Sequence, residues 1–202
     1  MHRTKGTVLI SLLALSLSGC VSNRPIKYYT IQLPAVPTLS ANTYPVSLLV
    51  GNIGGQEIFH DTPIAYRVGT NEIGTYQYSR WAEPPVDMLK SKLIRMLNTS
   101  GDYQSVAALG STSDGQFVLR GKLYAFEEVD GGSITGLVSM EFELCDRKSG
   151  KVLWSRFYSE SEPVDGKKIS AVVTALDLNL DRGLKQVAAG LNQYFAVNVA
   201  KK

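Results

Sequence analysis

The chain has 202 residues, of which 44% are hydrophobic and 19% charged. These proportions are typical of a folded globular protein and exclude a disordered chain, a collagen and a polytopic membrane protein. The formal net charge is +3, and it falls to +1 if Arg3 and Lys5 are removed with an N-terminal signal. A nucleic-acid-binding protein neutralises many phosphates with Lys and Arg, so this near-neutral balance excludes nucleic acid as a partner.

The N-terminal residues follow the order of an export signal. Basic side chains within residues 1–6 precede an apolar stretch at residues 7–17, and small residues then lead to Cys20. The apolar stretch is too short to cross a bilayer, which takes about 20 residues. Residues 17–20, Leu-Ser-Gly-Cys, resemble a bacterial lipobox, in which the chain is cut before the cysteine and the cysteine is acylated.

This resemblance predicts a signal peptide at residues 1–19, which is removed, and a lipidated Cys20 that carries an N-acyl chain and an S-diacylglycerol group. Two or more acyl chains form a stable anchor, because each buried methylene contributes about 0.8 kcal/mol. Val21 stands where an Asp would resemble the inner-membrane retention signal of enterobacteria, so we expect the periplasmic face of the outer membrane. Residues 20–26 form a short tether, which at full extension spans about 25 Å and keeps the domain close to the bilayer.

Residues 27–202 are expected to form one domain that begins with strands. Residues 28–33 are rich in aromatic and β-branched side chains and end before Pro34, which predicts a first strand. Residues 46–50 are a continuous apolar run, which predicts a buried strand. No Gly-Lys-Ser/Thr sequence follows this run, so we expect a turn rather than a phosphate-binding loop at its glycines, Gly51, Gly54 and Gly55.

A hairpin and a helix are predicted next. Residues 64–68 and 73–78 are two short strand-like runs separated by Gly69-Thr70-Asn71, which predicts a hairpin. Apolar residues at intervals of three to four from Val86 to Leu97 then predict an amphipathic helix that ends at Ser100. Pro84 and Pro85 suit its first turn, where the backbone N–H groups have no helical partner.

The second half of the chain alternates first with the period of strands and then with that of a helix. Residues 117–125, 138–145 and 152–159 predict an antiparallel meander. From Ile169 the apolar side chains fall on one face of a helix, in which two glycines make a break near residues 179–183 possible. The expected fold class is therefore α+β: one domain with a mostly antiparallel or mixed sheet and two main helices packed on one face.

The sequence offers little enzyme chemistry. His60 is the only histidine outside the signal, and neither a nucleophile-elbow motif nor a zinc-binding histidine pair is present. Cys145 is the only cysteine besides Cys20, so we expect a buried free thiol rather than an internal disulfide or a zinc site. Glu141 and Glu143 share the polar face of a strand, which predicts a solvated surface. We therefore expect a protein that is not an enzyme, has no catalytic residues and holds no metal or cofactor.

Arg80 and Trp81 stand directly before the first helix, and two interpretations remain open. The pair is either a packed anchor between the hairpin and the helix or a contact for a partner or ligand, because a cation and an indole can both stack on aromatic groups. The apolar stripes of the two helices likewise predict either core or a lipid-binding groove.

Several segments resemble one known family. The lipobox, residues 28–33 (YYTIQL), residues 63–67 (PIAYR) and residues 80–84 (RWAEP), which open a helix, resemble the ABC-type transport auxiliary lipoproteins, the family of the paraquat-inducible lipoprotein C. Residues 144–154, a strand followed by an Asp-x-x-x-Gly turn and a Trp, also resemble the later portion of this family. The resemblance covers most of the chain that follows Cys20.

The resemblance implies an outer-membrane lipoprotein that works with an ABC-type system and a periplasmic MCE-domain protein in lipid trafficking between two membranes. Its mechanism would be docking to the MCE partner, with Tyr66, Arg67, Arg80 and Trp81 shaping the surface used. Docking to a ring-shaped MCE assembly is compatible with a symmetric homo-oligomer. The alternative is an outer-membrane lipoprotein that regulates or scaffolds cell-wall synthesis, although such a regulator needs a longer tether to reach the wall.

Overall fold

The computed structural model describes residues 24–33 and 44–199. Within these ranges the chain forms one eight-stranded mixed sheet and two long helices, which confirms the α+β fold class. The elements in chain order are β1 (Lys27–Tyr29), β2 (Tyr44–Gly55), the short 3-10 helix η1 (Glu57–Phe59), β3 (Pro63–Val68), β4 (Glu72–Trp81), α2 (Pro85–Ser100), β5 (Tyr103–Ala108), β6 (Phe117–Asp130), β7 (Ile134–Asp146), β8 (Val152–Pro163) and α3 (Ile169–Asn198).

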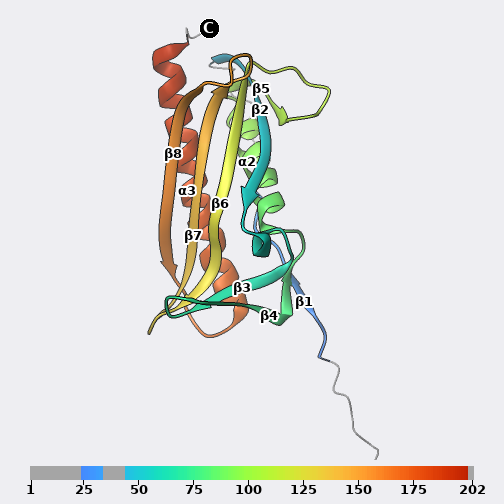
Figure 1. The fold of residues 1–202 in the computed structure, drawn as a ribbon, viewed down its shortest axis with the longest axis vertical. Coiled ribbons are helices and arrows are strands. Elements are labelled where there is room, and N and C mark those ends of the chain that lie inside the picture. Colours follow the sequence, from blue (N-terminus) through green and yellow to red (C-terminus); the bar gives the residue numbers. More distant parts are fainter. Residues whose placement is uncertain (1–23, 34–43, 200–202) are drawn as a thin grey trace, which may run out of the picture.

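Strand β6 organises the sheet (Figure 1). One of its edges pairs with β7 in the antiparallel sense from Phe117 to Asp130, and β8 continues the predicted meander beyond β7. The other edge is shared, because β2 runs parallel to residues 117–123 and β3 runs parallel to residues 127–130. Strand β5 extends the β2 branch, whereas β4 and β1 extend the β3 branch. The sheet is therefore forked at β6.

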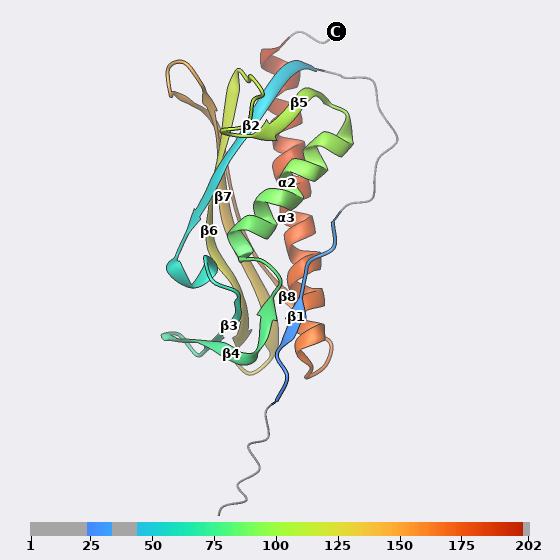
Figure 2. The same ribbon diagram turned by 90° about the vertical axis from the view of Figure 1, so that its right-hand side faces the viewer.

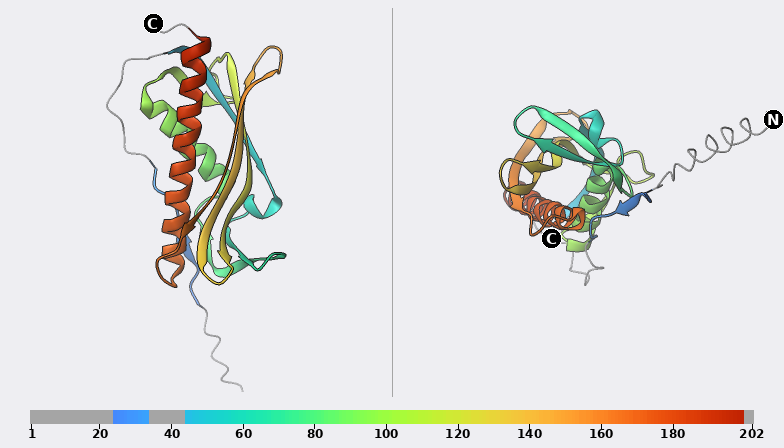
Figure 3. Two further views of the ribbon diagram at one scale, coloured as in Figure 1. Left: turned by 90° about the vertical axis from the view of Figure 1, so that its left-hand side faces the viewer. Right: turned by 90° about the horizontal axis from the view of Figure 1, so that it is seen from below.

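Both helices cover the same face of the sheet, as expected (Figures 2 and 3). Helix α2 packs on β2 and β5, and α3 packs on β7 and β8. The strand side chains that face them are fully buried, among them Val138, Met140, Phe142 and Leu144, as the period-two alternation predicts. The view from below in Figure 3 shows the sheet curling around the helices.

A buried ion pair joins the two helices. The ammonium group of Lys92 in α2 lies 2.6 Å from a carboxylate oxygen of Asp177 in α3, and the Lys92 side chain is only 3% exposed. The other carboxylate oxygen of Asp177 accepts a hydrogen bond from the backbone N–H of Gln32, at 3.1 Å. The segment that follows β1 is therefore tied to both helices.

Three local expectations need correction, and one strand was missed. The turn at the three glycines is wrong, because β2 continues to Gly55: β6 offers a long free edge with which residues 53–55 pair. The first strand is shorter than expected and ends at Tyr29. Helix α3 has no break near residues 179–183, since it is continuous to Asn198. Strand β5 was not predicted from its sequence.

The signal peptide and Cys20 lie outside the described residues. None of the helices within residues 24–33 and 44–199 is long and apolar enough to span a bilayer. The described chain begins at one end of the elongated domain, beside the loop between β8 and α3, whereas α3 ends at the opposite end (Figure 1). We call the first of these the tether end, defined by residues 24–28, the β3–β4 hairpin and the loop at residues 164–168.

Candidate functional site

The four residues predicted to shape a partner surface lie on the hairpin branch of the fork. Tyr66 and Arg67 are in β3, and Arg80 and Trp81 close β4. The structure separates them into two pairs: Tyr66 and Arg67 lie beside the C-terminal part of β6, whereas Arg80 pairs with Pro63 at the other end of β3. All four therefore belong to the tether end, although they do not form one cluster.

Arg67 compensates a buried carboxylate. Its Nε donates to Oε1 of Glu127 at 2.6 Å, and the Glu127 side chain has no exposed area while that of Arg67 is 28% exposed. Oε2 of Glu127 is also buried and has no hydrogen-bond partner among the described residues. Because a buried charge is costly unless it is paired, this ion pair holds β3 against β6. The guanidinium group of Arg67 is thus engaged by Glu127 within the domain.

Tyr66 belongs to a small aromatic cluster on the same hairpin. Its ring centroid lies 5.0 Å from that of Tyr76, and a Cβ atom at Gly74 would lie 2.6 Å from the Tyr66 ring. Gly74 is therefore required by close packing. The Tyr76 hydroxyl donates to Oε2 of Glu128 at 2.9 Å, and burial followed by this bond raises the pKa of Tyr76 well above its ordinary value.

Trp81 is an anchor and not a surface residue. Its side chain is fully buried, and its ring centroid lies 5.2 Å from that of Phe126 in β6. Its backbone pairs with Tyr29, so the indole lies where β1, β4 and the start of α2 meet. Of the two interpretations left open for this residue, its burial favours the packed anchor between the hairpin and the helix. It shapes the predicted partner surface only by holding β1 and β4 in place.

Arg80 keeps part of its side chain at the surface. Its Nη1 donates to Oγ1 of Thr62 at 3.5 Å, and its Nε is buried without a partner among the described residues. A contact with a partner at Tyr66, Arg67 and Arg80 stays a prediction.

The other residues considered for chemistry occupy separate places. His60 is exposed directly after η1, and Cys145 is a buried free thiol, as predicted. Glu141 and Glu143 are half-buried on the sheet face that turns away from the helices, where Glu141 accepts a hydrogen bond from Tyr124 at 2.7 Å. The described part of the chain contains no group of three or more His, Cys, Asp and Glu residues arranged to hold a metal ion.

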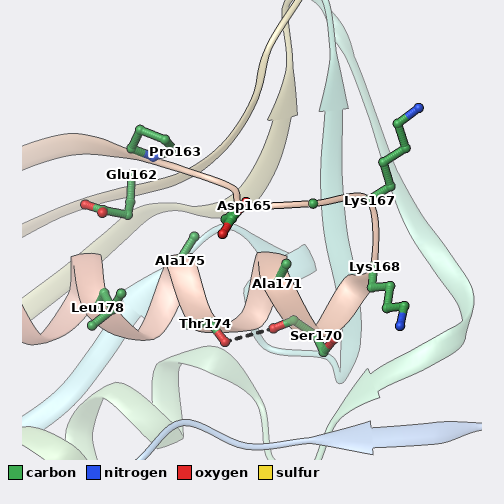
Figure 4. A pocket seen from close by; sticks show the side chains of 11 residues that line it. Glu162, Pro163, Asp165, Lys167, Lys168, Ser170, Ala171, Thr174, Ala175 and Leu178 are labelled. Atoms are coloured by element: carbon green, nitrogen blue, oxygen red, sulfur yellow. Dashed lines mark hydrogen bonds between the residues drawn. The ribbon is translucent and has the colours of Figure 1, made fainter.

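Two adjoining hollows at the tether end were not anticipated from the sequence. One, of about 660 Å³, lies between α3 and the loop that precedes it, and Figure 4 shows Lys167 and Lys168 extending outward from that loop. The other, of about 480 Å³, shares Lys168 and is also lined by Arg24 and Lys27. The only sequence feature that marks this site is the short Gly-Lys-Lys run at residues 166–168. Nothing in the pattern of the sequence shows that this run lies beside residues 24–27.

Comparisons with solved structures agree with this fold. Protein XCC0632 from Xanthomonas campestris, of the DUF330 family, has a TM-score of 0.76 at 19% identity over 86% of this chain and 99% of its own. An uncharacterised protein has a TM-score of 0.67 at 17% identity over 83% and 99%. The hypothetical protein CT253 from Chlamydia trachomatis has a TM-score of 0.51 at 9% identity over 74% and 97%. These identities show similarity of fold alone.

The comparison with curated proteins found no match. By contrast, residues 29–188 match the family of ABC-type transport auxiliary lipoprotein components. This range runs from β1 to the middle of α3 and includes the hairpin, the fork and the meander. Since the match spans most of the chain, the protein belongs to the ABC-type transport auxiliary lipoprotein component family.

Proposed function

We propose that this protein is the outer-membrane component of an ABC-type system that moves lipids between two membranes, and that it acts by docking to a periplasmic MCE-domain protein. The observation that carries the proposal is the family match over residues 29–188. The lipobox at residues 17–20 and the residue that follows it support an anchor in the outer membrane. The acylated Cys20 would hold the domain there, and any nucleotide chemistry would belong to a separate subunit.

The position of the hairpin supports a docking role. Tyr66, Arg67 and Arg80 are half-buried on β3 and β4, at the end of the domain from which the tether leaves. A lipid conduit that crosses the periplasm has to end beside the bilayer that receives or supplies its cargo. A partner that contacts this hairpin is therefore held next to the outer membrane, and the ion pair between Arg67 and Glu127 keeps the hairpin fixed on the sheet.

Site-specific photo-crosslinking in native cell envelopes tests the docking proposal. Thr75 is exposed on β4 and pairs with Ala65, so a photo-reactive amino acid there probes the hairpin without disturbing the buried groups. The matched control is Val197, which is 81% exposed at the opposite end of the domain. We expect position 75, and not position 197, to capture an MCE-domain protein.

Two other capture results would contradict the proposal as stated. Capture of cell-wall synthases instead would overturn the proposal and favour the regulatory alternative, and capture of an MCE-domain protein only at position 197 would move the docking surface to the other end. A Cys20→Ala variant tests the anchor separately. If that variant still fractionates with membranes as the parent protein does, lipidation is not what holds the domain there.

A further inference from the structure

We infer that one side of the tether end, formed by Arg24, Lys27, Lys167 and Lys168, lies directly on an anionic bilayer surface and fixes the orientation of the domain. We call these four residues the basic face. The inference rests on the proposed lipid anchor and adds to it a second, electrostatic contact with the same membrane. The occupant is the bilayer that carries the anchor.

The four cations gather from segments far apart in sequence. Arg24, Lys27 and Lys168 line one hollow, and Lys167 joins Lys168 in the adjoining one. Within the described ranges the side chains of these four residues have no hydrogen-bond or ion-pair partner, whereas the side chain of Lys92, for example, is paired with Asp177. The N-terminus of the 30-residue helix α3 points into the same region and adds positive partial charge.

Acidic side chains do not cancel this charge. Two carboxylates line the hollow below the loop, those of Glu162 and Asp165. Glu162 is already bound to Arg182 of α3, which leaves Asp165 to oppose the basic face. A net positive surface of this kind attracts the anionic headgroups of a membrane leaflet.

Aromatic side chains accompany the cations. Tyr29 and Tyr78 line the hollow together with Lys27, and Tyr78 is 37% exposed. Tyrosine suits the boundary between headgroups and acyl chains, because its ring is apolar and its hydroxyl polar. The combination favours a bilayer surface over a soluble anion, which would not use the apolar groups.

Because the anchor is close to the basic face, weak contacts with the lipid headgroups are sufficient to hold this face on the membrane. Arg24 lies four residues after Cys20, so an acylated Cys20 keeps the basic face within about 14 Å of the membrane. Such a short tether gives a high effective concentration of the two surfaces. Each basic residue near an anionic leaflet is worth about fivefold in the docking equilibrium, so two of them contribute about 25-fold.

The test uses the full-length lipidated protein in vesicles. A single label is placed at Ser170→Cys, beside the basic face, or at Val197→Cys, at the far end of the same helix. Cys145 is buried and Cys20 acylated, so neither takes the label. Vesicles of phosphatidylethanolamine with one quarter phosphatidylglycerol are compared with phosphatidylethanolamine and phosphatidylcholine alone, and the bilayers carry nitroxide lipids that quench the label on contact.

We expect quenching at position 170 in the anionic vesicles only, with none at position 197. The Lys167→Gln/Lys168→Gln variant should lower the docking equilibrium constant about 25-fold, and both changes are at exposed positions that leave the fold intact. Equal quenching in both vesicle types, or no loss in the double variant, would overturn the inference.

The failure of the proposed function is distinguishable from the failure of this inference. Full-length protein that does not float with any vesicle contradicts the lipid anchor. Protein that floats with both vesicle types but shows no charge-dependent quenching keeps the anchor and contradicts the basic face.

Discussion

The two halves of this domain are built in different ways. One half, which we call the meander half, consists of β6, β7, β8 and α3, and its strands follow one another in the chain and pair antiparallel. The other, the fork half, consists of β1 to β5 and α2, and four of its five strand pairings, including those with β6, are parallel. Parallel pairing joins segments that are distant in sequence, so it needs long connections.

The difference extends to the side chains that hold each half. The meander half is held mainly by apolar residues, such as Met140 and Phe142, which face α3. The hairpin branch of the fork half instead depends on polar links across the sheet, Arg67 to Glu127 and Tyr76 to Glu128. The motifs at residues 28–33, 63–67 and 80–84 and the start of the described chain also lie in the fork half, whereas the motif at residues 144–154 lies in the meander half. The surface that we connect with a partner is thus in the less regular part of the molecule.

The largest effect is expected from Trp81→Ala. Trp81 is fully buried where the strands of the fork half meet α2, so its removal leaves a large cavity and should cost about 3–5 kcal/mol of unfolding free energy. Trp154, which is half-buried on β8, is the matched control, and Trp154→Ala should cost about 1–2 kcal/mol. Urea unfolding measures both. If both variants lose the same unfolding free energy, Trp81 is no more important to the fork half than the half-buried Trp154 is to the meander half.

Arg67→Met should rank next. The change leaves the carboxylate of Glu127 buried and unpaired, which is expected to cost about 2–3 kcal/mol, since water reaches part of the Arg67 site. The double variant Arg67→Met/Glu127→Gln removes the charge as well and should recover much of the loss. A double-mutant cycle in urea measures the coupling energy. Additive losses would show that the ion pair does not stabilise the fork half.

Asn179→Ala tests the principal polar site of the meander half. Asn179 is fully buried in α3, and its amide donates to the backbone oxygens of Gly136 at 2.9 Å and Glu160 at 2.6 Å, while its side-chain oxygen accepts from Tyr158. The substitution removes both hydrogen bonds to these carbonyl oxygens and should cost about 2 kcal/mol, whereas Tyr158→Phe should cost about 1 kcal/mol. Thermal unfolding ranks the two variants. If Asn179→Ala costs more than Arg67→Met, the meander half depends on polar contacts at least as much as the fork half does, which contradicts the comparison above.

The same division explains what could be predicted from sequence. Alternation of apolar residues predicted the meander and both helices, because each element buries one face and its neighbours follow directly. The pairing of β2 with β6 could not be predicted, since Gly51, Gly54 and Gly55 resemble a turn until a distant strand supplies hydrogen-bond partners. The motif at residues 80–84 was recognised by resemblance, but the burial of Trp81 depends on β1, which pairs beside it in space.

The basic face illustrates the same limit. Lys167 and Lys168 follow the meander in sequence, whereas Arg24 and Lys27 precede the whole domain, and no local pattern brings them together. Their proximity results from the parallel pairing of β1 with β4 next to the start of α3. Sites assembled by the fork half are therefore accessible only once the three-dimensional arrangement is known.

Two glycines of α3 sharpen the comparison within the meander half, and the smallest change in stability is expected at one of them, Gly190. Alanine normally stabilises a helix by about 1 kcal/mol relative to glycine. A Cβ at Gly183 would lie 2.7 Å from the ring of Tyr158, which is buried and held by Asn179, so Gly183→Ala should cost about 1–2 kcal/mol. A Cβ at Gly190 would lie 2.6 Å from the ring of Trp154, which is half-exposed and can move aside, so Gly190→Ala should change stability by less than about 0.5 kcal/mol. Thermal unfolding separates the two, and an equal loss at both positions would mean that the exposed edge at β8 is packed as rigidly as the centre of the meander.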